Sequence, residues 1–239
     1  MAHSTLDSKE ILKTINLLKM RIEERFPSSG LGRVCGELQE IARQTNETIE
    51  VIQQKRYGYR LLVFIFVLVM LFIAMMGLSR LRAAGDTITL MDMIQVLDAA
   101  FNIIVLIGGS IIFLVSIENR AKRSKVIKAV YELRCLAHVI DAHQLTKDPC
   151  FANQNVIRTP HSPERSMNGF QLGRYLDYCS EMLSLISKIG FLYVQDYHDS
   201  VATEAVNDLD DLTNGLSRKI WQKIMTLKKD IDNQLKLTV

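Results

Sequence analysis

Two long runs of apolar residues dominate the hydropathy pattern of the chain. Residues 61–78 read LLVFIFVLVMLFIAMMGL and residues 99–117 read AAFNIIVLIGGSIIFLVSI, and neither run contains a charged side chain. At ~1.5 Å per residue, the first run makes a helix of about 27 Å, close to the hydrocarbon thickness of a bilayer. The soluble alternative is two buried core helices, but a domain of this size rarely buries two helices that are apolar all round. The pattern therefore predicts a hairpin of two transmembrane helices.

Helical spacing of apolar residues continues on both sides of this hairpin. Residues 6–26 predict a short amphipathic helix, and residues 27–30, Pro-Ser-Ser-Gly, end it. The seam that follows alternates steps of four and three, which is typical of a coiled coil, and consists of Val34, Leu38, Ile41, Thr45, Thr48 and Ile52. We therefore predict one nearly continuous helix over residues 31–81. The second run is likewise expected to continue as a helix to Pro149, with its apolar stripe at Val126 or Ile127, Val130, Leu133, Ala137 and Ile140.

The C-terminal third predicts a loop and two further helices. Residues 148–169 contain three of the four prolines, together with Asn, Ser and Gly, which is typical of an exposed loop. The first helix after it carries Leu172, Leu176, Cys179, Leu183, Ile186 and Ile189, and the second carries a stripe from Val201 to Leu235. No alternating strand pattern competes with these helices.

The predicted fold class is an all-α membrane protein, with a two-helix transmembrane hairpin continuous with a cytoplasmic helical bundle or coiled coil. Residues 1–57 form the N-terminal cytoplasmic helices and residues 58–118 form the hairpin. Residues 119–148 continue the second span, residues 149–169 form the loop, and residues 170–239 form a C-terminal cytoplasmic helical hairpin.

Basic residues near the span ends predict the orientation. Lys55, Arg56 and Arg60 precede the first span, and Arg120, Lys122 and Arg123 follow the second, whereas the connection at residues 79–98 holds only Arg80 and Arg82. The positive-inside rule then places both termini in the cytoplasm. The net charge of +3 fits anionic lipid headgroups better than nucleic acid. All four cysteines would face the reducing cytoplasm, so no disulfide is expected among Cys35, Cys135, Cys150 and Cys179.

Small and polar residues collect on the second span only, at Asn102, Gly108, Gly109, Ser110 and Ser116. Such residues favour close helix packing and interhelical hydrogen bonds in a membrane. They can also line a water path if several copies assemble. The sequence leaves both interpretations open.

The chain contains no recognisable catalytic motif, so an enzyme and a resident cofactor are not expected. The nearest approach to a metal site is the group Cys135, His138, Asp141 and Asp148 around His143. The alternative, which we favour, is that Cys135 is a small core residue and His138 an interfacial one. Trp221 lies beside the apolar stripe of the last helix, which predicts a packing anchor.

Two segments carry a resemblance to known proteins. AHVIDAHQLTKDP (residues 137–149) and LSRKIWQKIM (residues 216–225) resemble segments of uncharacterised bacterial membrane proteins. The architecture of residues 56–140 resembles bacterial two-span effectors of the SLATT type, which implies a bacterial plasma membrane and perforation of that membrane on a cue. The long helical region after the hairpin departs from such effectors, and no functional residue carries over.

Three hypotheses follow. The first is a non-enzymatic membrane scaffold, assembly or signalling protein whose partners are the lipid bilayer and either a second copy or another helical protein. The second is an oligomeric channel lined by the second span. The third is a membrane enzyme with a site within residues 135–143.

Overall fold

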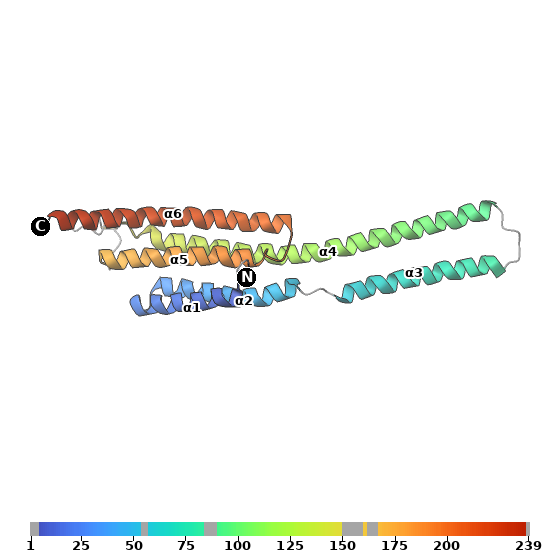
Figure 1. Cartoon of the computed structure of the whole chain (residues 1–239), viewed down its shortest axis with the longest axis horizontal. Coiled ribbons are helices and arrows are strands. Elements are labelled where there is room, and N and C mark those ends of the chain that lie inside the picture. The colour runs from blue at the N-terminus through green and yellow to red at the C-terminus, as the bar shows by residue number, and fades with distance from the viewer. Residues whose placement is uncertain (1–4, 54–56, 84–89, 150–159, 162–166, 238–239) are drawn as a thin grey trace. The chain divides into compact units, whose positions relative to one another are not determined.

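The computed structural model describes residues 5–53, 57–83, 90–149, 160–161 and 167–237 (Figure 1). Within these residues the regular structure is entirely helical, in the order α1 Ser8–Arg25, α2 Gly30–Gln53, α3 Tyr57–Ala83, α4 Leu90–Leu145, α5 Gly169–Leu192 and α6 Ser200–Leu237. The chain divides into two compact units, a bundle of Met1–Gln53 with Arg123–Val239 and a hairpin of Gln54–Lys122. The helix α4 contributes residues to both units.

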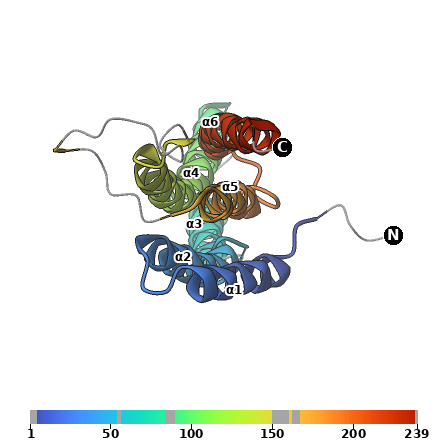
Figure 2. The same ribbon diagram turned by 90° about the vertical axis from the view of Figure 1, so that its left-hand side faces the viewer.

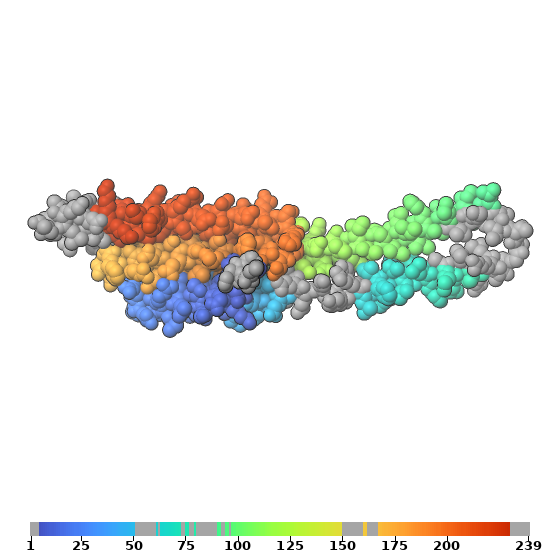
Figure 3. Space-filling model, in the orientation of Figure 1, coloured from blue at the N-terminus to red at the C-terminus, as the bar shows by residue number. Residues whose placement is uncertain are grey.

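Five helices build the bundle, with α5 at its centre. The helix α5 contacts α6, α1 and α2, and α1 also contacts α2. Seen along the helices, α4 and α5 lie side by side, with α6 on one side of them and α1 and α2 on the other (Figure 2). Figure 3 shows the side chains of α5 filling the space between α6 and α1. The core therefore draws on every helix of the unit.

The helical stripes predicted for the bundle are largely confirmed by burial. Ile11, Ile15, Leu18 and Ile22 of α1 are buried, as are all six residues predicted for α5. On α4 the structure selects Val126 rather than Ile127 and then buries Val130, Leu133, Ala137 and Ile140. The seam predicted as a coiled coil instead packs inside the bundle, where Val34, Leu38 and Thr45 are buried.

Side-chain hydrogen bonds fix the ends of these helices. Asp7 accepts from the Lys9 amide at the start of α1. At the start of α5, Asn168 and Gln171 form a capping box in which each side chain accepts from the other residue's backbone amide. Such caps satisfy amides that have no partner within the helix. The Asn168 to Gln171 spacing was a readable signal that our sequence reasoning missed.

Three predictions about single side chains are wrong. Cys135 is exposed rather than a core residue, and Trp221 is 57% exposed rather than a packing anchor. Val201, predicted to begin the buried stripe of the last helix, is 40% exposed, because the neighbouring Ala202 faces the core in its place.

Two further predictions concern continuity of the chain. The continuous helix expected over residues 31–81 coincides with α2 and α3, and its junction at residues 54–56 lies outside the described residues. The second helix begins before the apolar run at residues 99–117, because α4 starts at Leu90. Most of the loop predicted at residues 148–169 lies outside the described residues.

Candidate functional site

The hairpin unit exposes large apolar side chains instead of burying them. On α3 they include Phe64, Leu68, Phe72 and Met75, which are between 50% and 69% exposed. On α4 the unit exposes Phe101, Ile104, Val105 and Ile112 to a similar degree. A soluble surface rarely carries so many contiguous apolar groups. Within the described part of the hairpin unit, these side chains are left uncovered.

Among the described residues, α4 is the helix long and apolar enough to cross a membrane. Its candidate segment is Leu97–Leu145, and no part of its most apolar window is buried. The described apolar stretch of α3 is shorter, at Val63–Phe72.

The structure separates the five small and polar residues predicted as a group on the second span. Ser110 shares a half-buried stripe of α4 with Ile103, Ile107 and Leu114, and α3 carries a half-buried stripe at Val63, Phe66, Val67 and Met70. Gly108 is also half-buried, but it lies two residues from Ser110 and therefore on another side of α4. Asn102, Gly109 and Ser116 are exposed instead and recur every seven residues, which places them on another face of α4. The five residues thus do not share one face of α4.

The local geometry of these residues shows what they do within one copy. The Ser110 hydroxyl donates to the Leu106 carbonyl at 2.7 Å, and the Asn102 amide donates to Asp98 at 3.3 Å. A Cβ atom added at Gly108 or Gly109 would meet nothing within 4 Å. No contact within a single chain therefore requires glycine at either position.

Of the basic residues that flank the spans, those after α4's apolar segment have described side chains. Lys122 pairs with Glu118 at 2.8 Å, and Arg120 is exposed. Arg123 points instead into the bundle. Lys55 and Arg56 lie outside the described residues, as does the side chain of Arg60.

Arg123 and Asp199 form a clamp between α4 and the start of α6. The Arg123 guanidinium donates to both Asp199 oxygens, with its shortest contact at 2.7 Å. The same carboxylate accepts from the Ala202 amide at 2.9 Å and so caps α6. These hydrogen bonds, led by that of Arg123, hold the pKa of Asp199 below its usual value. One carboxylate thus fixes the place where α4 enters the bundle.

The other end of α4 is held by a second polar contact with α6. The Lys223 ammonium donates to the Gln144 carbonyl at 2.9 Å and to the Gln144 side chain at 2.6 Å. Gln144 in turn donates to Asp141 at 2.6 Å. A cation suits the C-terminal end of a helix because the helix dipole is negative there. Burial nevertheless lowers the pKa of Lys223.

The group predicted as the nearest approach to a metal site is dispersed. Asp141 bonds Gln144, and His143 lies against the first turn of α2, where a Cβ on Gly30 would be 2.6 Å from its ring. Cys135 and His138 are exposed on the outside of α4. No cluster of three His, Cys, Asp or Glu with metal-binding geometry occurs within the described residues.

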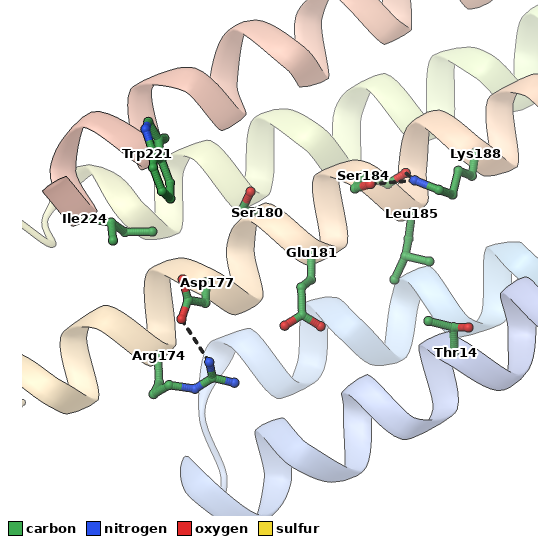
Figure 4. A pocket seen from close by; sticks show the side chains of 10 residues that line it. All are labelled: Thr14, Arg174, Asp177, Ser180, Glu181, Ser184, Leu185, Lys188, Trp221 and Ile224. Carbon is green, nitrogen blue, oxygen red and sulfur yellow. Dashed lines mark hydrogen bonds and ion pairs between the residues drawn. The ribbon is translucent and has the colours of Figure 1, made fainter.

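The bundle carries a polar cleft of about 480 Å³, with α5 as its floor (Figure 4). Arg174 pairs there with Asp177 at 3.0 Å, and Lys188 donates to Ser184 at 2.6 Å. Glu181, which also lines the cleft, forms an ion pair with Arg21 of α1 at 2.7 Å. Trp221 stands at the α6 wall. Its polar side chains bond one another or a neighbouring helix, so the cleft is a polar seam between helices.

Comparison of the chain with protein-family models, with curated proteins and with solved structures returned no match.

Proposed function

We propose that the chain is a non-enzymatic membrane protein in which a two-span hairpin anchors a cytoplasmic helical bundle, and that the bundle acts as a scaffold, assembly or signalling component. The observation that carries this proposal is the dual composition of α4. Its first half exposes Phe101, Val105 and Ile112, and its second half buries Val130, Leu133 and Ile140 in the bundle core. One helix thus has a lipid-compatible part and a core-forming part, which suits it to link events in the membrane to the bundle.

The second span of the proposed hairpin is α3. Its described side chains from Leu61 to Met76 are apolar, and its half-buried stripe at Val63, Phe66, Val67 and Met70 complements that of α4. Its exposed groups, such as Phe64 and Phe72, fit lipid tails. Basic residues flank the hairpin on its bundle side, so both termini belong in the cytoplasm, at a bacterial plasma membrane by the resemblance drawn from the sequence.

Extraction of membranes from cells expressing the full chain tests the anchoring. Sodium carbonate at alkaline pH removes peripheral proteins and leaves integral ones in the pellet. We expect the chain to remain in the pellet and to dissolve only with detergent. Release into the carbonate supernatant would contradict the proposal.

A channel is the second candidate function, favoured by the exposed residues Asn102, Gly109 and Ser116. Their seven-residue spacing places polar and small groups along one exposed face of α4. Purified protein in dye-filled liposomes separates the two functions. A scaffold leaves the liposomes tight, whereas a channel releases dye, and Asn102→Leu should then slow the release.

A further inference from the structure

The half of α4 that lies in the bundle has an apolar stripe on its outer side. This α4 outer stripe consists of Ile127, Tyr131, Cys135, His138, Ala142 and Leu145, all of them exposed. The steps of four, four, three, four and three residues keep the six side chains on one face of the helix. The face that packs into the core is a different one, which carries Val130, Leu133 and Ile140. The bundle therefore uses α4 on one side only.

The composition of the outer stripe is that of an interface rather than of a solvated helix face. Tyr131 and Leu145 are each 64% exposed and Ile127 is 38% exposed. Exposed charged residues, Lys128 and Glu132, border the stripe. An apolar centre with a polar rim is typical of protein–protein contacts, and tyrosine is enriched in them.

The same spacing occurs earlier on α4, within the hairpin unit. Asn102, Leu106, Gly109 and Phe113 follow one another at steps of four, three and four, and all are exposed. Gly109 has open space where a side chain would be, and Asn102 can hydrogen-bond across helices. A partner that matches both segments must therefore offer a membrane helix and a cytoplasmic helix.

We propose that this partner is a second copy of the chain, paired with the first in parallel through the α4 outer stripe. This inference rests on the proposed membrane anchoring, because two copies inserted in one membrane share an orientation and can only pair in parallel. At roughly 200 Å² per aromatic side chain, Phe113 and Tyr131 together expose on the order of 250 Å². The aliphatic members of both segments raise this to several hundred Å² per copy, which approaches the ~800 Å² of a standard stable interface.

Disulfide crosslinking tests the register of the pair. In a parallel symmetric pair each stripe residue faces the same residue of the second chain. Oxidation with copper phenanthroline should therefore form a disulfide between the two Cys135 residues. Burial raises the pKa of the Cys35 thiol to about 11 and that of Cys179 to about 12, which keeps both unreactive. The background for this experiment carries Cys150→Ser.

A matched pair of cysteine variants supplies the control for this crosslink. With Cys135 also replaced by serine, Tyr131→Cys should restore the covalent dimer, and Glu132→Cys, on the next residue but off the stripe, should not. Equal crosslinking at both positions, or none at Cys135 and Tyr131→Cys, would overturn the proposal.

The mass of the detergent-extracted protein provides a second readout that needs no cysteine. We expect a multiple of the 27.2 kDa chain for the wild type and for Glu132→Lys, and a shift of Tyr131→Lys toward the mass of one chain. A wild type of single-chain mass, or a Tyr131→Lys variant with the wild-type mass, contradicts the paired stripe. Carbonate extraction of the same samples keeps the two proposals apart, because a monomer that stays in the pellet refutes the pairing and leaves the anchoring intact.

Discussion

The bundle and the hairpin treat their apolar side chains in opposite ways. In the bundle, Ile15, Leu133 and Ile186 are fully buried, and the polar contacts lie around the core. In the hairpin, Phe64, Ile104 and Ile112 are at least 61% exposed. The bundle removes its apolar groups from water with its own helices, whereas under the proposed function a lipid phase covers those of the hairpin. Their difference gives each region a distinct response to the same kind of substitution.

The largest expected contrast is between two isoleucines of the same helix. Ile140→Ala removes a fully buried side chain and should lower the free energy of unfolding of the bundle by about 2–5 kcal/mol, because it leaves a cavity. Ile112 is 69% exposed in the hairpin, so Ile112→Ala should change that free energy by less than ~0.5 kcal/mol. Thermal unfolding in detergent measures both, and equal losses would show that the hairpin packs like the bundle.

A smaller contrast is expected between two glycines. A Cβ at Gly190 would lie 2.8 Å from a Leu209 methyl group, so Gly190→Ala forces α5 and α6 apart and should cost about 1–3 kcal/mol. Gly109→Ala meets no atom within 4 Å and should leave the bundle's unfolding unchanged. The same melting experiment compares them. A stable Gly190→Ala variant would mean that α6 can move away from α5 at little cost.

The smallest expected effect concerns the clamp where α4 enters the bundle. Asp199→Ala removes the cap of α6 and should cost about 1 kcal/mol, whereas Asp199→Asn keeps an acceptor for the Ala202 amide and loses only the charge paired with Arg123.

The pH dependence of the clamp follows from the lowered pKa of Asp199. A carboxyl whose pKa is lower in the folded chain stabilises it above the unfolded pKa of about 4, and the contribution is lost as the pH falls further. The wild type should therefore melt above Asp199→Asn at pH 7, and the gap should close toward pH 3. A gap that does not depend on pH would show that the ion pair contributes nothing.

The sequence predicted the helices and most of their buried stripes because a period near 3.6 is a local signal. It could not predict which side chains face the core at the start of α6, where Val201 is exposed and Ala202 and Val206 are buried. The orientation of this helix start depends on Asp199, which bonds Arg123, a residue 76 positions earlier in the chain. The sequence also could not separate the half-buried Ser110 from the exposed Asn102 and Gly109, because burial depends on the contacts of α4 in the folded chain. Pairing between distant segments is not encoded in the spacing of either one.

The proposed function requires the hairpin to cross the membrane twice, with the bundle on one side and the connection between the spans on the other. The most direct measurement is labelling with a membrane-impermeant maleimide, in chains lacking Cys135 and Cys150, at Thr87→Cys in the connection or Glu132→Cys in the bundle. Thr87→Cys should react in spheroplasts and be protected in inside-out vesicles, and Glu132→Cys should show the reverse. Reaction of both positions from the same side of the membrane would contradict the two-span hairpin.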